Sequence, residues 1–257
     1  MIVRELILGM AVLWFLAAGE TPGVAAEPQP GAAAKQPVAA AETQPPGALV
    51  YVPPKTGAPR GRVGGGARGG AQGPSGGGPV SLSVLAPDHP GLTVEAQPTL
   101  YWYLSRSANA PVEFTIMTDE TTRPLFETRI SESGQPGVQR VRLADYGVHL
   151  DPGVAYRWYV ALVPEPARRS RDVLAGGVIE RVEPPSGLEA KLSKAPAADA
   201  PRIFAEAGIW YNAIASLSAL IEASPRDAAL KEQRAVLLEQ VGLKNVAAYD
   251  RSVSAAQ

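Results

Sequence analysis

The chain has 257 residues, and its 24 lysines and arginines against 25 aspartates and glutamates give a formal net charge of −1 at pH 7. General nucleic-acid binding requires a basic excess that neutralises phosphates, so this balance argues against that class of protein. The chain contains no cysteine, which argues against lipoprotein anchoring, disulfides, thiol catalysis and thiolate metal sites.

Residues 1–26 have the pattern of a cleavable secretory signal. An apolar stretch from Leu6 to Ala18 follows Arg4, and small residues then lead to Ala26. The stretch is shorter than the roughly 20 residues that a membrane-spanning helix needs, and no later stretch is long and apolar enough for a span. We expect cleavage after Ala26 and export to the periplasm, cell envelope or extracellular space. The alternative is an uncleaved N-terminal anchor.

Residues 27–79 are rich in alanine, proline, glutamine and glycine. Such a segment buries too little apolar area to offset the entropy of ordering it, so its composition predicts a disordered linker. It contains a dinucleotide-fingerprint string at 64–69 and a nucleophile-elbow string at 73–77. Both motifs require a strand before them and a helix after them, which the flanking residues do not provide. We interpret both strings as products of composition.

Order is expected to begin near Val80. Short alternating runs bounded by turn residues recur about every ten residues, which is the spacing of a β-sandwich or barrel. The predicted strands are residues 80–85, 92–95, 99–104, 112–118, 125–130, 138–143, 155–163 and 172–182. We therefore predict a β-sandwich domain over residues 80–184.

Two of these strands alternate clearly enough to assign their faces. The expected core residues are Leu100, Trp102, Leu104, Tyr156, Trp158, Val160 and Leu162. Tyr101, Tyr103 and Tyr159 then lie on the opposite face, where they form an aromatic platform if exposed, or a second core if the C-terminal helices cover them. We favour the covered arrangement, because those helices must bury Trp210 and Ile214.

Residues 150–156 resemble the tyrosine corner of immunoglobulin-like and fibronectin type III sandwiches. A leucine, a Pro-Gly turn and Tyr156 open an alternating strand in the same order as in that corner. The resemblance implies a fold class and carries no function.

After residue 185 the apolar period changes from 2 to about 3.6, which indicates helices. One stripe runs from Ile203 to Ile221, with Gly208 where a helix pair would turn. A second helix is predicted to start with Ser224 as its N-cap and to stop at Gly242.

Residues 208–217 resemble the second helix of a tetratricopeptide repeat, and no second copy is visible. We predict a small tetratricopeptide-like helical hairpin over residues 185–245, followed by a tail over residues 246–257. The expected fold is thus mainly β with a C-terminal α part.

Three stretches form a recognisable pattern: Arg62-Val-Gly-Gly-Gly-Ala-Arg-Gly69, Arg169-Ser-Arg-Asp172 running to Gly177-Val-Ile179-Glu-Arg181, and Ala207-Gly-Ile-Trp-Tyr-Asn-Ala213. Together with the tryptophan strand at 99–104, they resemble a bacterial family of unknown function, the DUF928 proteins. The resemblance covers roughly Arg60 to the end of the chain. It implies export and this domain layout, and it supplies no activity.

The chain departs from that family's pattern at three positions. Many members carry cysteines where this chain has Gly70 and Pro164, and a disulfide that those cysteines form elsewhere would be missing here. An acid usually stands where this chain has Asn212, which argues against a catalytic role for this position.

The candidate binding residues are Arg169, Asp172, Arg181, Trp210 and Tyr211. The basic cluster at 168–171 offers charge to an anionic glycan, a lipid headgroup or an acidic partner. Alternatively, Asp172 pairs with an arginine and only holds the loop. We favour this structural interpretation, because surface charge runs are usually solvated.

No catalytic or metal-binding residues are predicted, and no cofactor. His89 and His149 each lie alone beside a turn, whereas zinc sites and acid/base triads need several convergent ligands. Asp119 and Glu120 are interpreted as turn residues.

We therefore expect a non-enzymatic envelope or periplasmic protein that acts as a binding or assembly module for a protein partner. One alternative is a carbohydrate-binding module that uses the tyrosine face or the Arg169 loop to bind a glycan. Another is a hydrolase with an unrecognised carboxylate pair, which two acids converging in a pocket would reveal.

Overall fold

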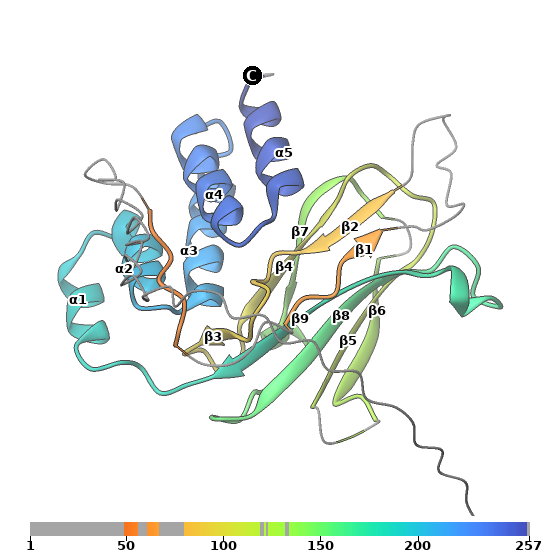
Figure 1. Ribbon diagram of the computed structural model, residues 1–257, viewed down its shortest axis with the longest axis horizontal. Helices are drawn as coiled ribbons and strands as arrows, with labels where there is room; N and C mark the ends of the chain where they lie inside the picture. The colour runs from red at the N-terminus through yellow and green to blue at the C-terminus, as the bar shows by residue number, and fades with distance from the viewer. Residues whose placement is uncertain are drawn as a thin grey trace, which may run out of the picture. The chain divides into compact units, whose positions relative to one another are not determined.

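The computed structural model describes residues 49–55, 61–66, 80–118, 121, 123–131 and 134–255. The predicted signal at 1–26 lies outside these residues, as do Asp119 and Glu120. Within the described residues the chain is mainly β, with helices at its C-terminal end (Figure 1). The predicted order of a β part before an α part is therefore confirmed.

The strands of the described residues form two sheets. The first sheet has the antiparallel order β1-β2-β4-β7, made of β1 (Gly65–Gly66), β2 (Ser81–Val84), β4 (Thr99–Leu104) and β7 (Gly137–Arg142).

The second sheet has the order β3-β9-β8-β5-β6. Its strands are β3 (Gly91–Thr93), β5 (Val112–Thr118), β6 (Phe126–Ser131), β8 (Ala155–Leu162) and β9 (Val173–Arg181). Only β3 runs parallel to its neighbour, β9, and the other pairs are antiparallel. All of the predicted strands are present close to their expected bounds.

The main core lies between the two sheets. The seven predicted core residues on β4 and β8 are at most 3% exposed. Successive side chains of a strand point to opposite faces, so the apolar set on each strand meets the other sheet. Trp158 contacts Phe114 of β5, with 6.3 Å between their ring centroids.

The C-terminal part is larger than the predicted hairpin. It comprises α1 (Leu188–Lys194), α2 (Ala200–Glu206), α3 (Trp210–Ala223), α4 (Ala228–Gln240) and α5 (Lys244–Ala255). The structure thus has α5 where a tail was predicted over residues 246–257. Half of its twelve residues are polar, and its buried apolar residues are the small Val246 and Ala247.

The helix boundaries follow turn chemistry. Gly208, with a φ of 76°, separates α2 from α3 at the predicted position. The N-cap of α4 is Asp227 and not Ser224, because Asp227 Oδ1 accepts hydrogen bonds from Ala229 N at 2.9 Å and Leu230 N at 3.2 Å. Ser224 instead follows the last turn of α3.

The helices gather on one side of the sheets, with α3 beside β3 and β4 (Figure 1). They cover Tyr101 and Tyr103 on the outer face of the first sheet, leaving these side chains 4% and 6% exposed. Tyr103 contacts Tyr249 of α5, with 5.0 Å between ring centroids. Tyr159 lies on the second sheet, so the three tyrosines share no common face. None of the described helices is both long and apolar enough to span a membrane.

The structure differs from the predicted linker at residues 49–55 and 61–66, which we call the strap. Leu49 and Tyr51 are buried. The side chain of Gln240, at the end of α4, holds the strap's backbone twice: Nε2 donates to Leu49 O, and Oε1 accepts from Tyr51 N, each at 2.8 Å. The rest of 27–79 apart from the strap lies outside the described residues.

The second half of the strap joins the edges of both sheets. Val63 exchanges two backbone hydrogen bonds with Gly176 of β9, at 2.8 and 3.0 Å. Two residues later, β1 pairs with β2 of the first sheet. The Gly-rich stretch therefore adds backbone pairing, together with two hydrogen bonds from the half-buried Arg62 side chain to Ala86 O and Val241 O. A composition argument does not detect such pairing.

Candidate functional site

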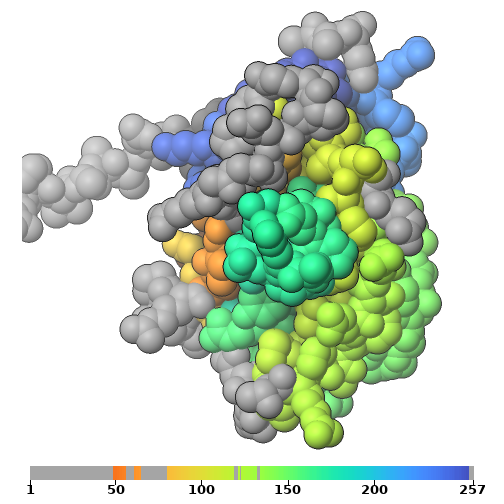
Figure 2. Space-filling model, turned by 90° about the vertical axis from the view of Figure 1, so that its right-hand side faces the viewer, coloured from red at the N-terminus to blue at the C-terminus, as the bar shows by residue number. Residues whose placement is uncertain are grey.

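The loop that carries Arg169 and Asp172 is held by one ion pair within the loop and by another to Glu113 of β5. Arg169 Nε lies 2.8 Å from Asp172 Oδ2, and its Nη2 lies 2.7 Å from Glu113 Oε2. The hydrogen bond to Glu113 raises the pKa of the Arg169 guanidinium, and burial raises the pKa of the Asp172 carboxyl. Figure 2 shows this loop, in teal, protruding at the surface. Asp172 thus pairs with an arginine, as the structural interpretation expected.

Trp210 and Tyr211 lie in the core, at 0% and 1% exposure. Trp210 Nε1 donates to Leu85 O at 2.9 Å. Tyr211 OH donates to Val178 O and accepts from Trp158 Nε1, each at 2.9 Å. Burial raises the pKa of Tyr211 well above its ordinary value. These two residues attach α3 to the sheets and present no surface to a ligand.

Arg181 donates from Nη1 to Leu150 O at 3.0 Å. It ends β9, whereas Asp172 immediately precedes the first residue of this nine-residue strand. A rise of about 3.4 Å per residue separates the two ends by roughly 27 Å. The structure therefore does not bring Arg181 together with the Arg169 loop.

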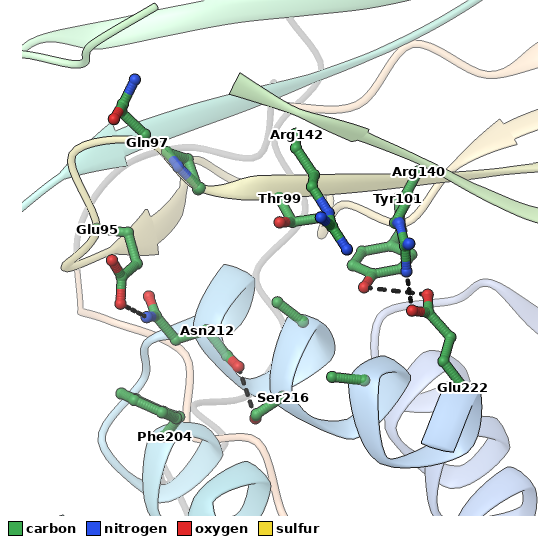
Figure 3. Close-up of a pocket in the computed structure, with 13 residues that line it drawn as sticks. Glu95, Gln97, Thr99, Tyr101, Arg140, Arg142, Phe204, Asn212, Ser216 and Glu222 are labelled. Carbon is green, nitrogen blue, oxygen red and sulfur yellow. Dashed lines mark hydrogen bonds and ion pairs between the residues drawn. The ribbon is translucent and has the colours of Figure 1, made fainter. Parts of the chain in front are cut away.

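A groove of about 410 Å³ lies between the outer face of the first sheet and α3 (Figure 3). It combines charged side chains with a partly apolar wall. It is lined by Glu95, Gln97, Pro98, Thr99, Tyr101, Arg140, Arg142, Phe204, Asn212, Ala215, Ser216, Ala219 and Glu222.

Two regular elements build the groove. On the sheet, Tyr101 pairs in register with Arg140, and Thr99 pairs with Arg142, so these four side chains share one face of β4 and β7. On α3, the lining residues recur at spacings of three and four, which places them along one face of the helix. The small residues in the middle of that face leave the space open.

One end of the groove is positively charged. Glu222 forms an ion pair with Arg140 and accepts a 3.5 Å hydrogen bond from Tyr101 OH. Burial raises the pKa of Tyr101, and the neighbouring arginines oppose this shift. The side chain of Arg142 lines the same region and makes no hydrogen bond or ion pair with any residue that the structure describes. The two arginines therefore face one carboxylate here.

The other end of the groove is organised by Asn212. Its Oδ1 accepts from Thr93 Oγ1 at 2.9 Å and from Val94 N at 3.1 Å, and its Nδ2 donates to Glu95 Oε1 at 3.4 Å. A carboxylate at this position has no hydrogen to donate and would repel Glu95. The amide thus matches its surroundings in this chain.

The two carboxylates of the groove do not converge. Glu95 lies beside Asn212, near the start of α3, and Glu222 lies near its end (Figure 3). Ten residues of helix at 1.5 Å each separate these positions by roughly 15 Å, whereas the carboxylates of glycosidases lie about 5–9.5 Å apart.

Metal-ligating groups are also scattered. The described part of the chain contains no cluster of three histidines, aspartates or glutamates that would hold a metal ion. His89 stacks on Tyr51 of the strap, with 5.8 Å between ring centroids, and His149 bonds only to Gly147 O among the described residues.

Sequence reasoning missed the groove because its residues come from separate elements. One signal was available: Arg140 and Arg142 alternate within the predicted strand at 138–143, which places two positive charges on one face. Nothing in the sequence indicates that α3 lies across that face.

No curated protein matches the chain. A family model, the Domain of Unknown Function (DUF928), matches residues 63–250. This range includes every strand of both sheets and all the residues that line the groove. Of the strap, residues 49–55 and 61–62 lie outside it. The chain therefore belongs to the DUF928 family.

Proposed function

We propose that this DUF928 protein is an exported, non-enzymatic binding module of the periplasm or cell envelope, and that its ligand site is the groove between β4, β7 and α3. The observation that carries the proposal is Arg142, a permanently charged side chain that lines the groove without an acidic partner among the described residues. A ligand with a negatively charged group would supply that partner.

The dimensions and chemistry of the groove support binding. Its volume of about 410 Å³ lies within the range of roughly 300–1,000 Å³ that is typical of ligand sites. Phe204 and the alanines of α3 offer apolar contact, while the arginines offer charged hydrogen-bond donors that would orient a ligand. This combination of apolar surface and a few convergent polar groups is common in binding sites.

A binding role accounts for the groove better than hydrolysis or sugar stacking does. Glu222 and Glu95 each have a partner within the chain, and they lie about 15 Å apart along α3. Tyr101 and Tyr103 lie under helices, which removes the aromatic platform that the carbohydrate-binding alternative requires.

We also infer that the two sheets form an immunoglobulin-like sandwich. The orders β2-β4-β7 and β9-β8-β5 correspond to strands A-B-E and G-F-C of that fold. The tyrosine corner adds independent support, because Tyr156 OH accepts a hydrogen bond from Asp151 N at 3.1 Å, five residues upstream. The successive helices α3, α4 and α5 are compatible with a tetratricopeptide-like unit, although a repeat is not evident.

Export is supported by the N-terminal pattern alone. N-terminal sequencing of the protein recovered from its native host tests it. We expect the mature chain to begin at Glu27, and a mature chain that begins at Met1 would contradict cleavage.

The binding proposal is tested with fluorescein-labelled decapeptides of one length that are acidic, neutral or basic. We expect saturable binding of the acidic peptide, measured by fluorescence anisotropy, and a loss of about tenfold in affinity for Arg142→Ala, because a charged hydrogen-bond partner is removed.

The matched control is Arg123→Ala, which removes the same charge from an exposed position between β5 and β6. It should leave the affinity unchanged. Equal losses in both variants would mean that only net charge matters, and the proposed site would then be wrong.

A further inference from the structure

We propose that an extended peptide segment adds as a strand to the free edge of β7, beside the groove, and carries acidic side chains at two alternate positions that face the arginines of the groove. This inference rests on the proposed function and specifies the chemistry of its ligand. It follows from the sheet order, from the charges on β7 and from the register between β4 and β7.

One edge of β7 carries no further strand. β7 is the last strand of the first sheet, and its backbone pairs with β4 alone. Among the described residues, no backbone hydrogen bond joins the other edge of β7 to a further segment. Alternate N–H and C=O groups on this edge therefore have no backbone partner among the described residues, and such a row is a template for an added strand.

The length of β7 is sufficient for that pairing. Gly137–Arg142 has six residues, whereas β1 and β3, the edge strands on the opposite side of the sheets, have two and three. Very short strands blunt an edge against pairing, and the strap further covers β2 and β9. Six residues provide a strand of ordinary length.

β7 carries two positive charges on one face. Arg140 and Arg142 lie two residues apart on β7, so they share the face that lines the groove. Their register partners on β4 are the uncharged Tyr101 and Thr99. A strand added to the other edge would place its own side chains about 4.5–5.5 Å from those of its register partners on β7.

This geometry predicts the peptide's sequence pattern. A carboxylate opposite Arg142 would form an ion pair with its guanidinium, which has no acidic partner among the described residues. A second carboxylate, opposite Arg140, would share that arginine with Glu222. The residue between them would neighbour Val141, which is buried, so an apolar side chain fits there. The expected motif is acid–apolar–acid.

The other six-residue edge strand, β6, lacks this pattern. It ends the second sheet and carries Glu127 and Arg129 on one face. A strand added there would face one acid and one base, which gives no preference for an acidic segment. The charge pattern therefore favours β7.

The test uses the full mature chain and four fluorescein-labelled peptides built from the same amino-acid residues and with the same charge. The first has a central Glu-Val-Glu. The second has the two glutamates adjacent. The third and fourth keep Glu-Val-Glu but are N-methylated at alternate backbone nitrogens, one at each of the two alternate sets. One of these two peptides therefore lacks the N–H groups with which it would pair with β7.

We expect the first peptide to bind at least about tenfold more tightly than the second peptide. The same advantage is expected over the weaker-binding of the two N-methylated peptides. Arg142→Ala should remove that advantage, and Arg123→Ala should retain it. The peptides carry the modification, so the test does not depend on the folding of a β7 variant.

Other outcomes separate this inference from the function on which it rests. If all the acidic peptides bind equally and Arg142→Ala weakens them all, the groove binds anions and strand addition is wrong. If inositol hexakisphosphate binds in an Arg142-dependent way while every peptide fails, the peptide ligand is wrong and an anion site stands. If none of these probes binds, both proposals fail.

Discussion

At the scale of single residues, Tyr211 shows how one side chain connects the helices to the sheets. Its hydroxyl accepts a hydrogen bond from Trp158 Nε1 and donates one to Val178 O, each at 2.9 Å. The ring fits only because residue 91 is a glycine: a Cβ there would lie 2.6 Å from Tyr211 Cε2. Sequence reasoning selected Tyr211 as a binding residue, because a motif does not reveal whether its aromatic side chain faces solvent or core.

Tyr211 also makes the protein's stability depend on pH. Burial raises the pKa of the folded protein's Tyr211 above the value of about 10 that it has in an unfolded chain. Its contribution is complete below pH 10 and is lost as the pH rises further, because the unfolded chain then releases a proton that the folded chain retains.

We therefore expect the free energy of unfolding to fall above pH 10, and to fall less steeply in Tyr211→Phe, by up to about 1.4 kcal/mol per pH unit. Near neutral pH the same variant should lose about 1–3 kcal/mol, because Trp158 Nε1 loses its acceptor. Urea denaturation at a series of pH values measures both effects.

Tyr146→Phe is the control, since Tyr146 is 40% exposed. Parallel pH profiles for the wild type and Tyr211→Phe would contradict the assignment of this pH dependence to Tyr211.

At the scale of elements, the strands were predictable and the last helix was not. Each strand combines alternation of period 2 with flanking turn residues, and both signals are local. The structure of α5 depends on distant partners. Its Asp250 accepts hydrogen bonds from Arg234 of α4 at 2.8 and 2.6 Å, and Arg234 also reaches Ser218 of α3 at 3.2 Å.

That ion pair fixes three helices to one another. The side chains of Arg234 and Asp250 are 7% and 2% exposed. Asp250→Ala leaves a buried guanidinium without its carboxylate, so we expect a loss of about 3–5 kcal/mol in the free energy of unfolding. Replacing both partners, as in Arg234→Met with Asp250→Leu, should cost less than the single change.

Chemical denaturation of the two variants provides the comparison. A double variant as unstable as Asp250→Ala would indicate that the specific geometry of the pair, and not the burial of an unpaired charge, stabilises these helices.

The strap was missed for a different reason, since a composition averaged over residues 27–79 conceals a short apolar run near Tyr51. Gln240→Ala removes both side-chain hydrogen bonds to its backbone. We expect faster cleavage after Lys55 and Arg62 under limited trypsin digestion, by about fivefold or more, because two hydrogen bonds worth about 1 kcal/mol each are lost.

Gln233→Ala is the matched control on the exposed side of α4. Equal cleavage of Gln240→Ala and the wild type would show that the strap is held mainly by Tyr51 and its aromatic neighbours, His89 and Trp210.

At the scale of the whole molecule, the candidate site lies between parts that the sequence predicts separately. The sheet face comes from predicted strands and α3 from a predicted helical stripe, so each wall of the groove was available in advance. Their juxtaposition was not, because local periodicity contains no information on which helix covers which sheet. Arg142 is therefore identified as a candidate only when both walls are in place.

The strap has a consequence for the order in which the chain matures. Leu49 and Tyr51 meet Gln240 across sequence separations of 191 and 189 residues. During synthesis, the strap leaves the ribosome about 190 residues before the residue of α4 that holds it. Closing so long a loop is slow, because its entropic cost precedes the contacts that repay it. The strap can thus dock only after α4 has been synthesised, so its attachment is a late step in folding.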